Sequence, residues 1–89
     1  METKKFLVVA SVNNHVAVLG KILAAFIKRH IDIDHLSVSK SPVEGVNSVT
    51  ICARTTEQAM RRLTAQLGSV YDVVDVSYHH YNELGAEAS

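Results

Sequence analysis

The residues best placed to do chemistry in this 89-residue sequence lie in the short segment Asn13-Asn14-His15. This segment separates an apolar, β-branched run from a pattern with helical spacing, so it stands where a strand turns into a helix. If Asn14 caps that helix, its side chain accepts one hydrogen bond from the first turn. The backbone N–H groups of His15, Val16 and Ala17 then stay available at the positive end of the helix dipole. A ligand carboxylate fits there; in the alternative interpretation Asn14 is only a helix cap and water satisfies the other groups.

Other reactive side chains form no recognisable site. The five histidines lack a metal-ligand spacing such as His-x-x-x-His, which favours scattered histidines over a metal site. Cys52, the single cysteine, lies in an apolar, strand-like run and is expected to be a buried, unreactive thiol. No carboxylate pair or Ser/His/Asp set can be placed together, so we expect no catalytic residues, no metal site and no cofactor.

Composition indicates a small domain without a nucleic-acid or membrane partner. Nine Lys and Arg balance nine Asp and Glu, and the formal net charge of zero gives no electrostatic attraction to phosphate backbones or lipid surfaces. No apolar stretch can span a bilayer, and the amino end METKKFLVV lacks the cleavage region of a signal peptide. These features predict a cytoplasmic protein. A chain this short buries a modest share of its surface, so we also expect an oligomer.

Hydrophobic periodicity predicts six elements in one domain, residues 1–80, followed by a flexible tail, residues 81–89. The elements are a strand over 6–12, a helix from 16 to near 30, strands over 33–39 and 47–53, a helix after Thr55, and a strand over 71–79. The turn residues of 41–45 predict a hairpin between the two middle strands. Thr55 and Gln58 resemble a capping box for the second helix, and Gly68 is expected to cap its carboxyl end.

The order β-α-β-β-α-β with right-handed crossovers predicts an α+β, ferredoxin-like sandwich. Its antiparallel sheet has the order 4-1-3-2, and both helices cover one face. This fold hosts many functions. The segments LVVASV and NSVTICA of the two central strands offer no aromatic residue at the positions where RNA-recognition domains carry them, and no Cys-x-x-Cys motif suggests a heavy-metal carrier.

A longer pattern runs through the first half of the chain. An apolar strand and the asparagine turn are followed by Val16-Ala17-Val18-Leu19, a helix carrying Phe26 and Arg29, and Ile31-Asp32-Ile33-Asp34. This pattern resembles an ACT domain and, more narrowly, the small regulatory subunit of acetolactate (acetohydroxyacid) synthase. The segment 66–76 is similar to the closing pattern of that family. The resemblance covers residues 5–78 and implies the short, single-domain type.

Members of this family regulate a thiamine-diphosphate enzyme and commonly bind branched-chain amino acids between two ACT domains. The resemblance therefore implies a non-catalytic subunit whose partners are the catalytic (large) subunit and a branched-chain amino acid effector. Asn14 matches the turn asparagine of the family, whereas Ala17 replaces its glycine and Asp32 its second asparagine. The implied effector-binding residues are Asn14, His15, Val16, Ala17, Val18, Leu19, Asp32 and Ile33.

Geometry places Asn14 and Asp32 at opposite ends of a helix about 20 Å long, so they cannot share a ligand within one chain. The strand over 33–39 is an exposed sheet edge. Pairing it with its copy about a two-fold axis brings Asp32 of one chain toward Asn14 of the other. We therefore expect a homodimer formed through this strand and the first helix. Two alternatives remain: a free-standing ACT-domain sensor of an amino acid or metabolite that regulates another enzyme or transcription, and an enzyme.

Overall fold

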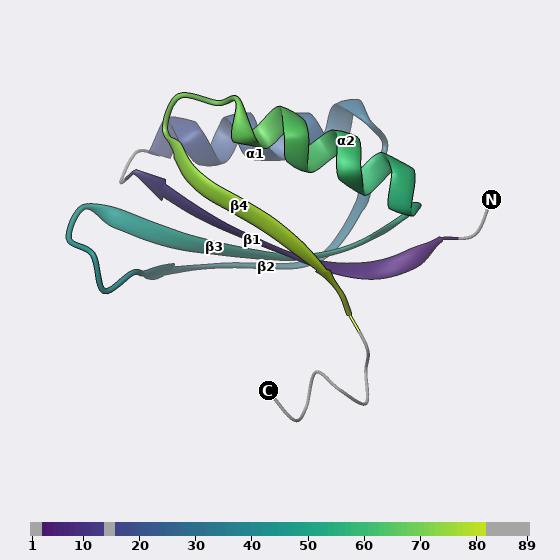
Figure 1. Ribbon diagram of the computed structural model, residues 1–89, viewed down its shortest axis with the longest axis horizontal. Coiled ribbons are helices and arrows are strands. Elements are labelled where there is room, and N and C mark those ends of the chain that lie inside the picture. The colour runs from purple at the N-terminus through teal and green to yellow at the C-terminus, as the bar shows by residue number, and fades with distance from the viewer. Residues whose placement is uncertain (1–2, 14–15, 82–89) are drawn as a thin grey trace.

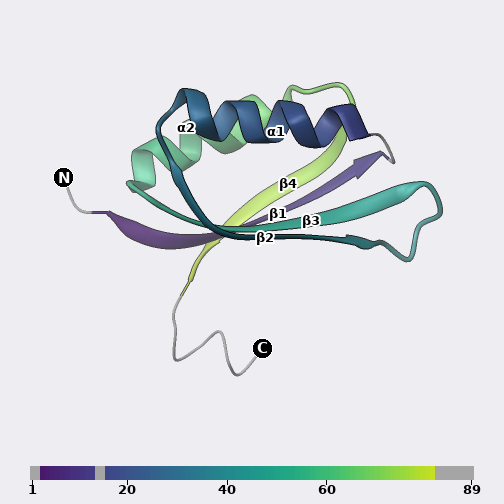
Figure 2. The ribbon, with the colours of Figure 1, turned by 180° about the vertical axis from the view of Figure 1, so that it is seen from behind.

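The structure is a computed structural model that describes residues 3–13 and 16–81. Its elements are β1 (Lys4–Asn13), α1 (Val16–Lys28), β2 (Asp32–Lys40), β3 (Val46–Thr55), α2 (Glu57–Gly68) and β4 (Val73–His80). The strands form one antiparallel sheet of order β2-β3-β1-β4, and both helices cover the same face of it (Figures 1 and 2). This arrangement confirms the predicted ferredoxin-like fold and its strand order.

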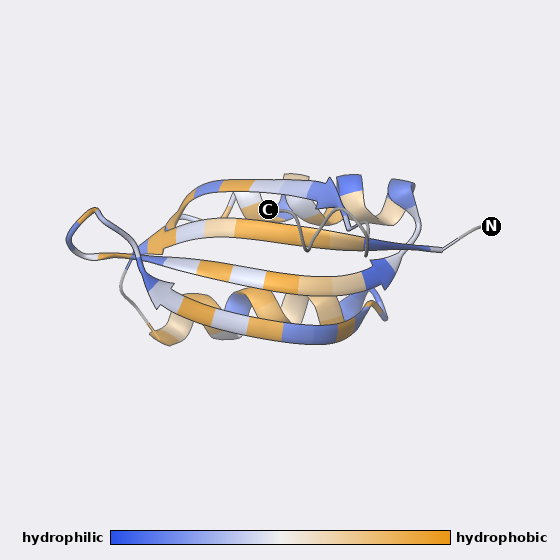
Figure 3. Ribbon diagram, turned by 90° about the horizontal axis from the view of Figure 1, so that it is seen from below, coloured by the Kyte–Doolittle hydropathy of each residue, from blue (hydrophilic) through white to orange (hydrophobic). Residues whose placement is uncertain are grey.

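The core lies between the sheet and the helix layer. Alternate residues of β1 point into it, and Phe6, Val8, Ala10 and Val12 are at most 3% exposed. Their partners from α1, β3 and α2 are Val18, Ile22, Ala25, Phe26, Val49, Ile51, Ala53, Met60, Leu63 and Leu67. Figure 3 views the opposite, open face of the sheet and shows β1 as apolar along most of its length. This composition suits a central strand that has a neighbour on each side and helices above it.

The carboxyl end of α1 is closed by two backbone hydrogen bonds. The His30 N–H donates to the Ile27 carbonyl at 3.0 Å, and the Ile31 N–H donates to the Phe26 carbonyl at 3.0 Å. His30 has a φ of 56°, in the left-handed region that favours glycine. These features form a Schellman motif, in which Ile31 and Phe26 are both buried in the core. The helix therefore ends at Lys28, slightly before the predicted end.

Both predicted caps of α2 are wrong by one residue. The N-cap is Thr56 and not Thr55, because the Thr56 Oγ1 accepts a hydrogen bond from the Ala59 N–H at 3.1 Å. At the other end Gly68 is still helical, and the C-cap is Ser69 with a right-handed backbone. The last turn closes when the Ser69 N–H donates to the Gln66 carbonyl at 3.1 Å, so no left-handed glycine is required.

The last strand begins at Val73, two residues later than predicted. A turn precedes it, in which the Val73 N–H donates to the Val70 carbonyl at 3.0 Å and Tyr71 is exposed. After β4, Tyr81 is attached to β1: its N–H donates to the Lys5 carbonyl at 2.8 Å. The rest of the predicted flexible tail, residues 82–89, lies outside the described residues.

Candidate functional site

The amino end of α1 is the first part of the candidate site. Asn14 and His15 lie outside the described residues, so the predicted anion-binding turn stays a prediction. Asn13, directly before them, donates its backbone N–H to the Asp72 carbonyl at 2.9 Å, and its Nδ2 lies 3.4 Å from the Asp72 Oδ1. These two bonds fix the end of β1 against the loop that precedes β4.

The first turns of α1 divide between the surface and the core. Val16 is 91% exposed and Ala17 is also exposed, whereas Leu19 is half-buried. Val18 is fully buried, and its side chain packs in the core. Of these predicted effector-binding residues, Val18 can therefore offer a ligand only its backbone, whereas the other three also have accessible side chains.

Asp32 and Ile33 begin β2 at the other end of the sheet. Asp32 pairs with Arg54 of β3, whereas Asn13 at the end of β1 pairs with Val46 of the same strand. Val46 and Arg54 are eight steps apart along β3, which corresponds to roughly 26 Å. Within one chain, Asp32 therefore lies far from Asn13 at the end of β1.

Most exposed residues of α1 are small or apolar, and the helix lies on the same side of the molecule as a free strand edge. Ile27 is 71% exposed, and a Cβ placed on Gly20 would meet no atom within 4 Å. Within the sheet β2 pairs with β3 alone, and Val38 shares the helix side of the sheet with its partner Val49. Figure 2 shows α1 and β2 together on one side of the molecule, away from α2 and β4. A helix with exposed apolar residues and a strand edge thus lie on the same side of the molecule.

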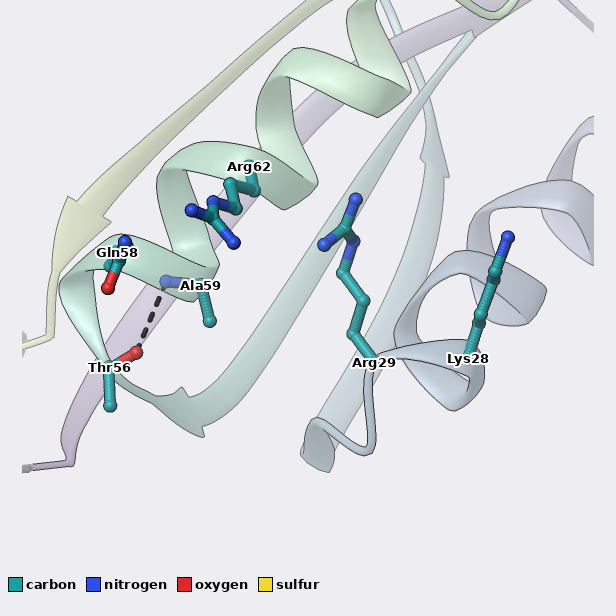
Figure 4. A pocket seen from close by; sticks show the side chains of 6 residues that line it. All are labelled: Lys28, Arg29, Thr56, Gln58, Ala59 and Arg62. Atoms are coloured by element: carbon teal, nitrogen blue, oxygen red, sulfur yellow. Dashed lines mark hydrogen bonds between the residues drawn. The ribbon is translucent and has the colours of Figure 1, made fainter.

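A second candidate site was missed by the sequence-based analysis. A hollow of about 440 Å³ lies between the carboxyl end of α1 and the amino end of α2 (Figure 4). We call it the basic hollow, and its lining residues are Lys28, Arg29, Thr56, Gln58, Ala59 and Arg62. Its signal in the sequence is a charge imbalance: α1, the turn that follows it and α2 contain five Lys and Arg residues but only one carboxylate, that of Glu57.

Other ionisable side chains form partly exposed pairs. The Arg54 Nε lies 2.9 Å from the Asp34 Oδ2, and the His80 Nε2 lies 3.1 Å from the Glu57 Oε1. Cys52 is half-buried and faces the open side of the sheet, so the expectation of a buried thiol is wrong. Its neighbours in β3 face the core, and a strand alternates its side chains between the two faces.

Within residues 3–13 and 16–81, no three His, Cys, Asp or Glu side chains come together as a metal site. In the same part of the chain, no helix has the length and apolar character needed to cross a bilayer.

Comparisons with known proteins identify the class of fold. No protein-family model matches the sequence. The ACT domain from GTP pyrophosphokinase of Chlorobium tepidum superposes with a TM-score of 0.73 at 11% identity, covering 88% of this chain and 100% of that one. The acetolactate synthase small subunit from Thermotoga maritima gives a TM-score of 0.76 at 23% identity, covering 84% of this chain and 47% of that one. The chain therefore has the fold of an ACT domain.

A curated relative indicates which ACT-domain proteins this chain resembles in sequence. The sequence is 29% identical over 76 residues to the probable acetolactate synthase small subunit of Methanothermobacter thermautotrophicus. The match covers 85% of this chain and 45% of that protein, so the chain spans less than half the length of both small subunits it resembles. The similarity to acetolactate synthase small subunits expected from the sequence is thus confirmed.

Proposed function

We propose that this protein is a non-catalytic regulatory subunit that binds the catalytic subunit of acetolactate synthase and changes its activity. The observation that carries the proposal is the match to a probable acetolactate synthase small subunit, which extends over 85% of this chain. The same ACT-domain architecture in a solved small subunit supports it. A protein of this kind acts by contact, and its own side chains need not perform chemistry.

Dimerisation is the second part of the proposal. Two copies pair their β2 strands antiparallel about a two-fold axis, which satisfies the free edge and extends the sheet across both chains. The exposed apolar residues Val16 and Ile27 of α1, together with Val38 of β2, supply the surface that this contact buries. Each 100 Å² of apolar area removed from water contributes about 2.5 kcal/mol, which is offset in part by the entropy lost on association.

The effector site belongs to this dimer. An amino acid places its carboxylate at the amino end of α1, against the backbone N–H groups of Val16, Ala17 and Val18 and beside Asn14 and His15. Asp32 of the other chain faces the ammonium group. The ligand's side chain meets apolar residues such as Leu19 and Ile33. The separation of Asp32 from Asn13 within one chain supports this arrangement, because a second chain is then needed to bring Asp32 close to the start of α1.

Reconstitution tests the proposed function. The acetolactate synthase catalytic subunit encoded in the same genome is mixed with increasing amounts of this protein, and acetolactate formation from pyruvate is measured. We expect turnover to change and to reach a plateau at a fixed molar ratio. An unrelated ACT domain of similar size serves as the control. Unchanged turnover and no co-elution at saturating concentrations would contradict the proposal.

A free-standing sensor is the second candidate. Ala17 and Asp32 depart from the glycine and asparagine of the family pattern, and these departures favour an effector other than valine. In that case the same dimer site reports to another enzyme or to a transcriptional target. Binding of an amino acid by the dimer without any effect on the catalytic subunit distinguishes this function from the first.

A further inference from the structure

The basic hollow carries an inference that does not depend on the proposed function. Lys28 and Arg29 stand at the carboxyl end of α1, and Arg62 extends from α2 on the other side of the hollow. Figure 4 shows the Arg29 side chain reaching from the end of α1 toward α2, and the Arg62 side chain lying over the first turns of α2 on the side of Gln58. Three cationic side chains from two helices therefore border one hollow of about 440 Å³.

These three charges are not neutralised by the described residues. No carboxylate lines the basic hollow, and neither Lys28 nor Arg62 has a side-chain hydrogen bond or ion pair in the described part of the chain. Glu57, in the first turn of α2, is engaged elsewhere: its carboxylate accepts a hydrogen bond from the Tyr78 hydroxyl at 3.0 Å and pairs with His80 on β4. Like charges gathered without a counter-charge repel one another, and a bound anion removes that repulsion.

Arg29 is already oriented for binding. Its Nε and Nη2 donate to the Gln66 Oε1 at 3.1 and 2.9 Å, which ties the guanidinium to α2. Because the acceptor is a neutral amide, the charge of Arg29 stays available, and the remaining N–H groups of its fork can still donate. A side chain that is held in place loses less conformational entropy when it binds a ligand.

We propose that the basic hollow binds a compact polyanion of the phosphoryl class. A single carboxylate cannot compensate three cations, whereas a phosphoryl group carries up to two charges and accepts paired hydrogen bonds from an arginine fork. The hollow also has the size of a small-ligand site. A long acidic segment of a protein would instead contact cations beyond the hollow, such as Lys21 and Arg61. Those two residues do not line it.

Titration with sodium pyrophosphate at constant ionic strength tests the proposal. Backbone amide shifts are followed by NMR in the wild-type protein, in Arg62→Gln and in the matched control Arg61→Gln. Arg61 is the neighbouring exposed cation of α2 but lies outside the lining. We expect saturable shifts centred on Gln58, Ala59 and Arg29. Arg62→Gln should weaken the affinity roughly tenfold, because it removes a charge-assisted pair of hydrogen bonds, and Arg61→Gln less than twofold.

One further variant and one further ligand complete the experiment. Arg62→Lys keeps the charge but loses the fork, so an affinity between those of the wild type and Arg62→Gln is expected. A glutamate-rich peptide tests the other kind of ligand. The proposal is overturned if pyrophosphate gives no saturable shifts, if Arg61→Gln weakens binding as much as Arg62→Gln, or if the peptide binds more tightly and shifts Lys21 and Arg61 as well. Thermal melts by circular dichroism verify that the variants are folded.

Discussion

Among residues 3–13 and 16–81, His30 is the one non-glycine residue with a positive φ. A β-carbon in the left-handed region costs about 1 kcal/mol, and His30 adopts this conformation because it ends α1 and lets Ile31 return to the core. We expect His30→Gly to raise the free energy of unfolding by about 0.5–1 kcal/mol, measured by urea denaturation.

Gly45 allows the reverse substitution, in which a glycine at positive φ is replaced by a residue with a β-carbon. Its φ is +82°, and a Cβ there would meet no atom within 4 Å, so the effect of a substitution comes from the backbone alone. Gly45→Ala should lower the free energy of unfolding by about 1 kcal/mol. A loss of stability in His30→Gly would show that the imidazole makes contacts that outweigh the backbone strain.

The charge of Asp32 decides how an effector lies in the proposed site. Asp32 is exposed at the start of β2, so Asp32→Asn should leave the fold intact. If its carboxylate faces the ammonium of a bound amino acid, the substitution removes a charge-assisted contact and should weaken binding about tenfold in calorimetry. Asn14→Ala should weaken it by a similar factor. Stronger binding in Asp32→Asn would reverse the orientation of the ligand.

At the scale of elements, β2 and β4 are the two edges of one sheet, and we expect only one of them to join two chains. Val38 of β2 is 46% exposed and Val74 of β4 is 61% exposed, so each edge strand offers one exposed valine for the same substitution. Val38→Lys places a charge in the proposed interface and should weaken the dimer at least tenfold in sedimentation velocity, whereas Val74→Lys should leave it unchanged. A wild-type monomer at micromolar concentration would contradict the dimer.

The elements themselves could be predicted because their patterns are strong. α1 keeps its apolar residues at helical spacing, and the middle strands carry β-branched residues between clear turn signals. The sequence specifies the ends of these elements less strongly than their type. Thr55 and Thr56 are both chemically suitable as a cap, and the sequence does not reveal which one leaves the strand. Gly68 stays helical because Ser69 closes the last turn with bonds that propensity does not anticipate.

For the whole molecule, the topology could be predicted and the sites only in part. Six elements in this order leave few arrangements once crossovers are right-handed and neighbours pair. The basic hollow could not be predicted from the sequence because its cations are remote in the chain: Arg29 and Arg62 line the same hollow only once α1 and α2 pack side by side. The total charge of zero also concealed them, since the surplus of cations in the helix layer is balanced by carboxylates elsewhere.

The central place of β1 also governs when the chain can fold during its synthesis. β1 is made first, yet it pairs with β3 on one side and with β4 on the other. Its second set of hydrogen bonds therefore has to wait until residues 73–80 have left the ribosome. Until then the emerging polypeptide exposes apolar side chains of strand 6–12 and of helix α1 that later elements cover. Molecular chaperones bind chains that expose apolar surface in this way. Folding of this domain is thus completed only after nearly all of it has been translated.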